Sequence, residues 1–453
     1  MTDVAESESN SAGGARPQTI LQGLADGSVT EPLSDHEIDG LTPEAVFAPE
    51  TIEALCAALA TCNGERLSVS PVGGLTRTKI GKIPARYDVA ISTSRLRSPI
   101  SHNQADLTAT VEAGITVSSL QESLAEHGQF VAIDPPLPDQ ATVGGTLAIG
   151  NSGPLRWQGW GLRDIVIGMK VASPNGDLTK SGGQVVKNVS GYDMSRLHIG
   201  GLGTLGIVAE VSFKLTPLPA GQATILASFR RPGDAFEAGM SVFHGRSSPL
   251  AMTLLSPVAA QRLNLIRKGS HHLAVRLHGR PRTLERMIDE ATAACGHHDT
   301  LELDRLDGAE HERIWRAVAD FGWDESTRPA ASVRISLPPA IAGEVLASLE
   351  SAAAARGLMP ALVTHVPSGT VLVHLYCPGE SINLGALAQV IADARKLTRQ
   401  RRGTAVLEQA PVKAKQSIDV WDGGGEAMAI MRRLKDLYDP NCTLNPGRFV
   451  GGI

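Results

Sequence analysis

Two periods of hydrophobicity run through this sequence, one typical of helices and one typical of strands. Apolar residues at helical spacing predict helices over 43–62 and 117–127. Val211 and Phe213 alternate with polar neighbours, as in a strand that buries one face. The Ser-Pro-Asn-Gly turn at 173–176 separates two further strand-like runs and therefore predicts a hairpin.

The pattern changes after Pro219, where helical and strand-like segments begin to alternate. We expect an α+β domain there, built on an antiparallel sheet that helices cover on one face. Helices are predicted over 283–295, 310–321, 340–355 and 385–401, and strands over 332–337, 361–365, 370–376 and 403–408.

Gly201, Gly203 and Gly206 have the GxGxxG spacing of a dinucleotide-binding turn. In that motif the glycines lead into a helix whose N-terminus holds a pyrophosphate. Here they lead into the strand pattern that begins at Ile207, and no acidic residue follows about 20 positions later. The sequence therefore argues against a Rossmann fold, although so many glycines suggest backbone close to a flat or anionic group.

Composition limits the classes of partner. A chain of 453 residues is long enough for about two or three domains, and its formal net charge of −5 gives no reason to expect nucleic acid or an anionic membrane. No apolar run approaches the roughly 18 residues of a membrane span, and the polar start of the chain lacks the core of a signal peptide. The five cysteines have no metal-site spacing, so we expect free thiols in a reducing cytoplasm.

Two glycine-rich segments are candidates for ligand contacts. In 71–76 a strand pattern runs into paired glycines, and the successive backbone N–H groups of such a turn suit a pyrophosphate; a plain β-turn is the alternative. In 134–153 prolines precede a run of glycine, threonine and serine, whose backbone can lie against a planar ring. We expect a long loop there, and a loop of this length inside a compact domain favours a function.

An ordered series of segments carries a resemblance to a known superfamily. These segments are 141–145, 161–164, 182–193, 200–206 and 444–448. Together with 71–76 they resemble the PCMH-type (vanillyl-alcohol-oxidase-type) FAD-binding domain over about 43–219. Within that superfamily the chain is most similar to the FAD-binding subunits of bacterial glycolate oxidase complexes.

The resemblance implies an α+β fold class, with a PCMH-type FAD-binding domain of two α+β subdomains followed by an α+β cap domain with an antiparallel sheet. The predicted division has a variable, partly disordered N-terminal tail over 1–38 and the FAD-binding domain over 39–219. The cap or substrate domain covers 220–427, and a C-terminal helix with a segment returning to the flavin covers 428–453.

The resemblance also implies FAD as cofactor, with its pyrophosphate on 72–76, its isoalloxazine beside 142–148 and 151–153, and adenine or ribose near 206–208. We predict non-covalent binding, because Leu75 and Thr76 stand where relatives that tether the flavin carry a histidine. The predicted cofactor-binding residues are Pro71, Val72, Gly73, Gly74, Leu75, Thr76, Pro135, Thr142, Gly144, Gly145, Ala148, Asn151, Ser152, Gly153, Gly206, Ile207, Val208 and Asn445.

The histidine motifs of related 2-hydroxy acid dehydrogenases are incomplete here. Those enzymes carry His-x-Gly-Asp-Gly-Asn-x-His and later Gly-Glu-His-Gly, which bind a divalent metal and take the hydroxyl proton. In this chain the first motif starts at His365 but has Leu372 in place of its second histidine. The second motif keeps its glutamate as Glu408 but has Gln409 in place of its histidine. Leucine and glutamine cannot take the place of imidazole as a metal ligand or as a base, so no metal site is predicted.

The candidate catalytic residues are His365, His374 and Arg334. His374 lies two positions late on the same face of its strand, where it could stand in for the missing histidine, and Arg334 could clamp a carboxylate. For His374 and Arg334 a purely structural role in their strands is the alternative.

From the resemblance we expect an FAD-binding oxidoreductase subunit of a glycolate oxidase (glycolate dehydrogenase) complex, which oxidises glycolate to glyoxylate. The implied partners are a catalytic flavin subunit and an iron–sulfur subunit, and the dispersed cysteines fit electrons leaving through a partner. The expected location is cytoplasmic, peripheral at the inner membrane through partners. The alternatives are a self-sufficient FAD-dependent 2-hydroxy acid or alcohol oxidoreductase, and a non-catalytic scaffold subunit.

Overall fold

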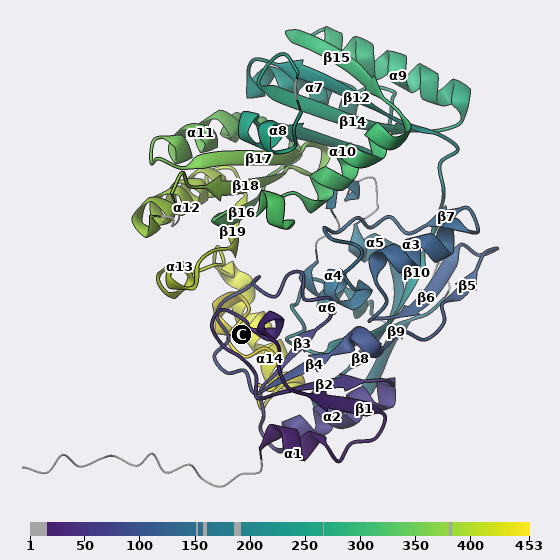
Figure 1. Cartoon of the computed structure of the whole chain (residues 1–453), viewed down its shortest axis with the longest axis vertical. Helices are drawn as coiled ribbons and strands as arrows, with labels where there is room; N and C mark the ends of the chain where they lie inside the picture. Colours follow the sequence, from purple (N-terminus) through teal and green to yellow (C-terminus); the bar gives the residue numbers. More distant parts are fainter. Residues whose placement is uncertain (1–15, 151–152, 157–160, 185–191, 266, 380–382) are drawn as a thin grey trace, which may run out of the picture.

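The computed structural model describes residues 16–150, 153–156, 161–184, 192–265, 267–379 and 383–453. Three larger sheets organise these residues: two lie close together at one end of the molecule, and the largest lies at the other end (Figure 1). Helices pack on all three sheets, and the α+β class predicted from the sequence is confirmed.

The first sheet is mixed and has the strand order β1-β2-β4-β3. Strand β1 runs antiparallel to β2, whereas β2, β4 and β3 run parallel to one another. Helix α2 begins after Thr51, whose side chain accepts a hydrogen bond from Ala54 N, and it buries Leu55 and Leu59 against this sheet. The elements are α1 (Pro17–Leu21), β1 (Gly27–Thr30), β2 (Ala45–Pro49), α2 (Ile52–Gly64), β3 (Val69–Val72) and β4 (Val89–Ser92).

The second sheet is antiparallel and has the order β5-β6-β10-β8-β9. The predicted hairpin at 173–176 joins β8 to β9, and the glycines of 201–206 lead into β10, which confirms both predictions. The elements are β5 (Ser101–Asn103), β6 (Thr108–Glu112), α3 (Val117–Ala125), α4 (Val143–Ile149), α5 (Leu162–Ile165), β8 (Val166–Ala172), β9 (Leu178–Gly182), α6 (Ser195–His198) and β10 (Ile207–Lys214). Strands β7 (Gln129–Phe130) and β11 (Thr216–Pro217) pair in a short two-stranded ribbon, after which the chain enters the third sheet.

The third sheet is antiparallel throughout, in the order β15-β12-β14-β13-β17-β18-β16-β19. Its strands are β12 (Gln222–Phe229), β13 (Ala251–Leu255), β14 (His271–His278), β15 (Thr300–Leu306), β16 (Ala331–Ser336), β17 (Met359–His365), β18 (Thr370–Tyr376) and β19 (Thr404–Gln409). Its helices are α7 (Pro232–His244), α8 (Pro257–Arg262), α9 (Pro281–Gly296), α10 (Gly308–Asp320), α11 (Gly343–Ala354) and α12 (Leu384–Arg399).

Helices cover both faces of this sheet, so the prediction of a sheet covered on one face was wrong. Alternate residues of β12 point to opposite sides: Ile225 joins the core beneath α7, α9, α11 and α12, and Leu226 joins the core beneath α8 and α10. Helix α10 buries Ile314 and Trp315 on the second side, between the sheet and the first half of the molecule (Figure 1).

The end of the chain returns to the first sheet through α13 (Val412–Ser417) and α14 (Met428–Tyr438). Residue Leu444 forms a parallel bridge with Val69, with Val69 N donating to Thr443 O at 2.7 Å and Asn445 N donating to Val69 O at 2.8 Å. The C-terminal segment therefore extends the first sheet beside β3, where Figure 1 shows it in yellow.

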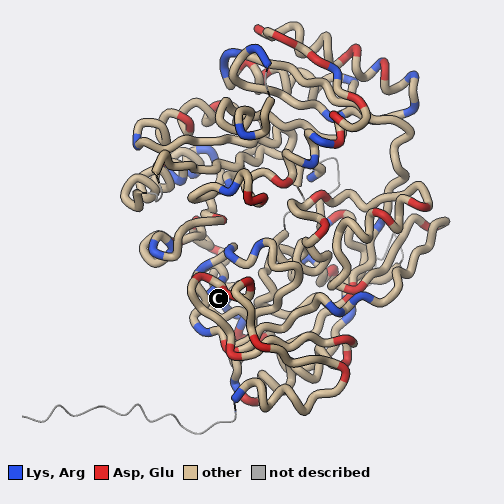
Figure 2. Tube along the Cα trace, in the orientation of Figure 1, with Lys and Arg blue, Asp and Glu red and all other residues tan. Residues whose placement is uncertain are grey.

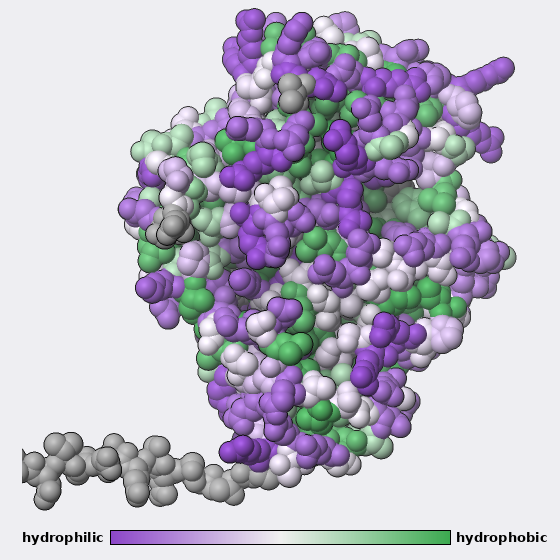
Figure 3. Space-filling view, in the orientation of Figure 1, coloured by the Kyte–Doolittle hydropathy of each residue, from purple (hydrophilic) through white to green (hydrophobic). Residues whose placement is uncertain are grey.

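Charges of both signs are interspersed along the trace at both ends of the molecule (Figure 2). On the face shown in Figure 3 hydrophilic residues predominate, and apolar residues form small patches between them. Within the described ranges, each helix is too short or too polar to cross a membrane.

Candidate functional site

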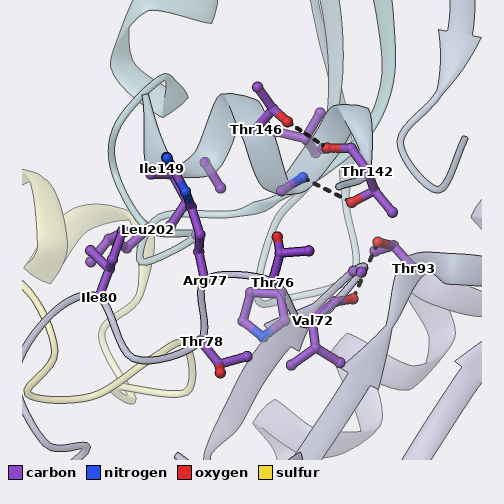
Figure 4. Close-up of a pocket in the computed structure, with 18 of the residues that line it drawn as sticks. Val72, Thr76, Arg77, Thr78, Ile80, Thr93, Thr142, Thr146, Ile149 and Leu202 are labelled. Carbon is purple, nitrogen blue, oxygen red and sulfur yellow. Dashed lines mark hydrogen bonds between the residues drawn. The ribbon is translucent and has the colours of Figure 1, made fainter. Parts of the chain in front are cut away.

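A pocket opens beside β3 (Figure 4). The space between its atoms amounts to about 990 Å³, part of which is open to solvent. Its walls come from the end of β3 with the loop that follows, the segment 135–149, the turn 198–208 and the C-terminal segment. All the predicted cofactor residues that the structure describes line it except Gly153, and Asn151 and Ser152 lie outside the described residues. Gly153 packs instead against the backbone of Asp134.

The loop after β3 closes tightly against the segment before α4. A Cβ atom added at Gly74 would collide with the carbonyl oxygen of Gln140, and one added at Gly73 would collide with Thr142 Oγ1. Leu75 has a φ of 57°, in the left-handed region that L-residues seldom adopt. The paired glycines thus let two backbone segments approach each other, and the narrow turn between them faces the pocket.

The glycine-rich segment that we expected to be a loop is helical over 143–149. Thr142 explains this helix: its Oγ1 accepts a hydrogen bond from Gly145 N at 3.2 Å, and its carbonyl accepts one from Thr146 Oγ1 at 2.9 Å (Figure 4). The helix ends at Gly150, which has a φ of 75°. Capping residues at both ends thus outweigh the low helical propensity of two adjacent glycines.

Asn445 brings an incompletely satisfied amide into the pocket. Its Nδ2 donates to Leu202 O at 2.5 Å, whereas its Oδ1 is buried without a hydrogen-bond partner among the described residues. A buried carbonyl oxygen in this state loses about 1–3 kcal/mol relative to a satisfied one. A ligand group that donates a hydrogen bond here would remove that penalty.

Arg77 also lines the pocket, and the sequence analysis missed it. Its guanidinium lies over the Trp323 ring, 4.4 Å from the ring centroid, and its Nε is buried without a partner in the described part of the chain. Burial lowers the pKa of Arg77 to about 10, with Glu408 acting in the opposite direction, so the side chain is charged at neutral pH. Arg77 is the first cationic residue after the paired glycines, a signal that could have identified it.

His198, also missed, lines the pocket beside Gly206, and burial lowers its pKa to about 4. The other lining residues outside every segment that the sequence analysis singled out are Ile38, Thr78, Ile80 and Thr93, whereas Pro136, Ile149, Leu202 and Arg448 belong to such segments.

His365 and His374 lie on the same face of neighbouring strands β17 and β18, outside the residues that line the pocket. Each Nδ1 contacts a hydroxyl group, at 3.0 Å from Thr253 Oγ1 for His365 and 2.9 Å from Ser332 Oγ for His374. Burial lowers the pKa of His365 to about 4 and that of His374 to about 3, so both rings are neutral at pH 7. A neutral imidazole can accept a proton.

The ring of His374 is enclosed. Phe321 packs edge-on at 5.2 Å between ring centroids, and Gly322 approaches so closely that an added Cβ would collide with the imidazole. His374 Nε2 is buried and lacks a hydrogen-bond partner within the described residues. His365 is therefore the better placed of the two histidines for chemistry with a ligand.

Arg334 pairs with Glu408 across β16 and β19, with 2.6 Å between Nε and Oε1. Both charges are close enough to Arg77 to influence its pKa, so two arginines and one carboxylate meet between the pocket and the third sheet. The excess of positive charge suits an anionic ligand. Among the residues that the structure describes, no three of His, Cys, Asp and Glu are grouped as metal ligands.

Residues 43–182 match the FAD binding domain family, and residues 218–449 match the family of FAD linked oxidases, C-terminal domain. Glycolate oxidase subunit GlcD of Bacillus subtilis (strain 168) is 26% identical over 427 residues, covering 90% of this chain and 88% of that protein. D-2-hydroxyglutarate dehydrogenase of Xanthomonas citri pv. viticola is 27% identical and covers 90% of this chain and 89% of its own length. The mitochondrial cytochrome-type D-lactate dehydrogenase of Arabidopsis thaliana is 24% identical, with 90% and 73% covered.

Two solved structures share the fold. p-Cresol methylhydroxylase with substrate bound superposes with a TM-score of 0.70 at 16% identity, covering 90% of this chain and 88% of that one. Alkyldihydroxyacetonephosphate synthase superposes with a TM-score of 0.68 at 15% identity, covering 90% and 78%. At such low identity these likenesses concern the arrangement of the backbone, and they confirm the predicted PCMH-type fold.

Proposed function

This chain belongs to the family of FAD linked oxidases, and on that premise we propose that it is the FAD-binding subunit of a complex that oxidises a short 2-hydroxy acid, with glycolate as the first candidate. FAD as cofactor and an oxidoreductase of the 2-hydroxy acid dehydrogenase type agree with the predictions made from the sequence. Glycolate, the partner subunits and the residue roles below are the proposed part.

The pocket fits FAD by its own chemistry. The turn at 73–76 lines the pocket and would hold an anionic pyrophosphate through its backbone N–H groups, and the buried Asn445 Oδ1 could accept a hydrogen bond from the cofactor. With Leu75 and Thr76 in this turn, we propose that binding is non-covalent. When bound, FAD supplies a two-electron acceptor for the hydride of the substrate α-carbon.

Arg77 and Arg334 then bind and orient the substrate carboxylate, because Arg77 lines the pocket and the charge of Arg334 on the third sheet is close enough to influence the pKa of Arg77. Glu408 holds Arg334 in place through their 2.6 Å contact. His365 accepts the hydroxyl proton at Nε2 when its Nδ1–H donates to Thr253 Oγ1. Loss of that proton and of the α-hydride converts glycolate into glyoxylate, and the two electrons leave through a partner subunit.

The observation that carries this proposal is the meeting of the predicted FAD pocket with the cationic pair of Arg77 and Arg334. A scaffold that binds no flavin would gain nothing from leaving Arg77 Nε and Asn445 Oδ1 buried and unsatisfied within the described residues.

A self-sufficient 2-hydroxy acid dehydrogenase is the second candidate. Relatives whose names describe dehydrogenases acting on D-lactate and D-2-hydroxyglutarate favour it.

The deciding experiment is a visible spectrum of the purified chain, followed by anaerobic addition of glycolate, D-lactate and D-2-hydroxyglutarate. We expect flavin absorbance that acid precipitation releases from the protein, and bleaching of the isolated chain that is reversed only when the partner subunits are added. Continued turnover of the isolated chain with oxygen or a soluble electron acceptor would establish the self-sufficient enzyme instead. A colourless protein that takes up no added FAD would exclude both.

A further inference from the structure

The loop of residues 77–82, which we call the Arg77 loop, forms no helix or strand, and two buried cations bind its carbonyl groups. Arg448 Nη2 donates to Thr78 O and Ile80 O, each at 2.5 Å. Lys415 Nζ donates to Lys79 O at 2.5 Å and to Gly81 O at 3.2 Å. The two cations thus bind four consecutive carbonyl oxygens alternately. They take the place of the backbone N–H donors that a helix or strand would provide.

Lys415 reaches the Arg77 loop from the other half of the chain. It lies on α13, a few residues beyond Glu408 at the end of β19, and its side chain has no exposed surface. Its third hydrogen bond joins Asp39 Oδ2 at 2.7 Å, and that carboxylate is 2% exposed. All three protons of the ammonium group are therefore used, two on the loop and one on its counter-charge.

Such a buried pair needs a reason other than stability. Removing two charges from water costs several kcal/mol per ion, and apolar residues of similar volume often stabilise a fold as well or better. The ammonium group instead fixes geometry, because two of its hydrogen bonds hold the loop relative to the strand that carries Glu408. In Figure 4 the Arg77 side chain points from this loop toward Ile149.

We propose that Lys415 is a positioning residue that sets the place of Arg77 for the substrate carboxylate. Through the Arg77 loop it fixes the distance between the guanidinium of Arg77 and the pair of Arg334 and Glu408, which belong to the third sheet. The inference rests on the proposed function, in which Arg77 binds a carboxylate.

The test is a double-mutant cycle on the FAD-loaded protein with Arg77→Met, Lys415→Met and the two combined. Oxalate, a dicarboxylate that need not react, serves as the probe, and its dissociation constant is measured by calorimetry alongside the KM for glycolate. We expect Lys415→Met to weaken oxalate binding and raise KM roughly tenfold in the natural background, but less than about twofold when Arg77 is already Met. Lys415→Arg restores part of the affinity, since a guanidinium also donates several hydrogen bonds.

Two controls separate positioning from general damage. Lys413→Met removes an exposed lysine from the same helix and should leave oxalate binding unchanged. Asp39→Asn with Lys415→Met avoids leaving a lone buried carboxylate, and hydrogen exchange at the Ile80 and Lys82 amides reports whether the loop has loosened in a folded protein.

Each outcome decides the question. Equal effects of Lys415→Met with and without Arg77 would overturn the positioning role while leaving the proposed function intact. If oxalate affinities show coupling between Lys415 and Arg77 but the protein oxidises no 2-hydroxy acid, the positioning role is supported and the proposed function is excluded. A natural protein that binds no oxalate would overturn the role of Arg77 and, with it, this inference.

Discussion

Lys435 and Asp439, one turn apart at the end of α14, form a buried ion pair with 2.6 Å between Nζ and Oδ2. Lys435 also donates to Thr204 O at 2.9 Å and to Leu444 O at 2.8 Å. Asp439 accepts from the backbone N–H groups of Thr443 and Leu444, each at 2.8 Å. The pair thus fixes the segment that brings Asn445 into the pocket.

Lys435→Met should therefore weaken FAD binding, although the Lys435 side chain itself does not contact the cofactor. We expect the dissociation constant of FAD, measured by fluorescence titration of the apoprotein, to rise on the order of tenfold because the wall that carries Asn445 loosens. Arg433→Met, on the exposed face of the same helix, is the matched control. Unchanged FAD affinity in a folded Lys435→Met/Asp439→Asn protein would contradict the prediction.

Gly74→Ala should abolish FAD binding. The new methyl group would collide with the carbonyl oxygen of Gln140, so the turn that faces the pocket must move away from the segment before α4. Gly64→Ala is the comparison, since a methyl group there meets no described atom within 4 Å. Flavin absorbance per protein after purification in excess FAD checks both variants, and a yellow Gly74→Ala protein with natural affinity would be evidence against the packing argument.

Substitutions in the Arg334–Glu408 pair should change anion affinity in opposite directions. Glu408→Gln removes the negative charge between two arginines, so oxalate should bind several-fold to roughly tenfold more tightly at low salt. Arg334→Met should weaken binding by a similar factor, because one of the two cations is lost. Inhibition constants at low and high salt test this, and a shift of both variants in the same direction would refute it.

The free energy of unfolding should fall on mild acidification, because buried histidines bind protons more readily in the unfolded chain. Burial lowers the pKa of His374 from 6.5 to about 3 in the folded protein. Between these values the unfolded chain binds more protons than the folded one, so the free energy of unfolding decreases as the pH drops below about 6.5, by up to about 1.4 kcal/mol per pH unit for one histidine. Urea unfolding from pH 7.5 to 4.5 should show a shallower dependence in His374→Gln, and identical slopes would exclude this titration.

The sequence predicted the elements whose signals are local. The Ser-Pro-Asn-Gly turn specified the β8–β9 hairpin, and the alternation of Val211 and Phe213 specified β10. Glycine-rich turns likewise identified most of the pocket, because backbone that must approach a ligand or another segment needs glycine.

Features that depend on contacts distant in the sequence were missed. Nothing near Arg77 indicates that Trp323 lies beneath its guanidinium or that Lys415 binds its loop. The amphipathic pattern of α10 predicted a buried face but not which side of the sheet it covers. For His374 the strand pattern placed the side chain on the correct face, yet its enclosure by Phe321 and Gly322 depends on packing after α10.

The pairing of the C-terminal segment with Val69 also orders events during synthesis. Thr443 Oγ1 contacts Asn63 Oδ1 across 380 residues of chain, and Asn445 stands beside β3. A nascent chain that has not yet reached residue 445 lacks one wall of the pocket, however completely its first two sheets have folded. We therefore expect FAD to bind only after the C-terminal segment has been synthesised, so that a fragment limited to the first half of the chain should be colourless.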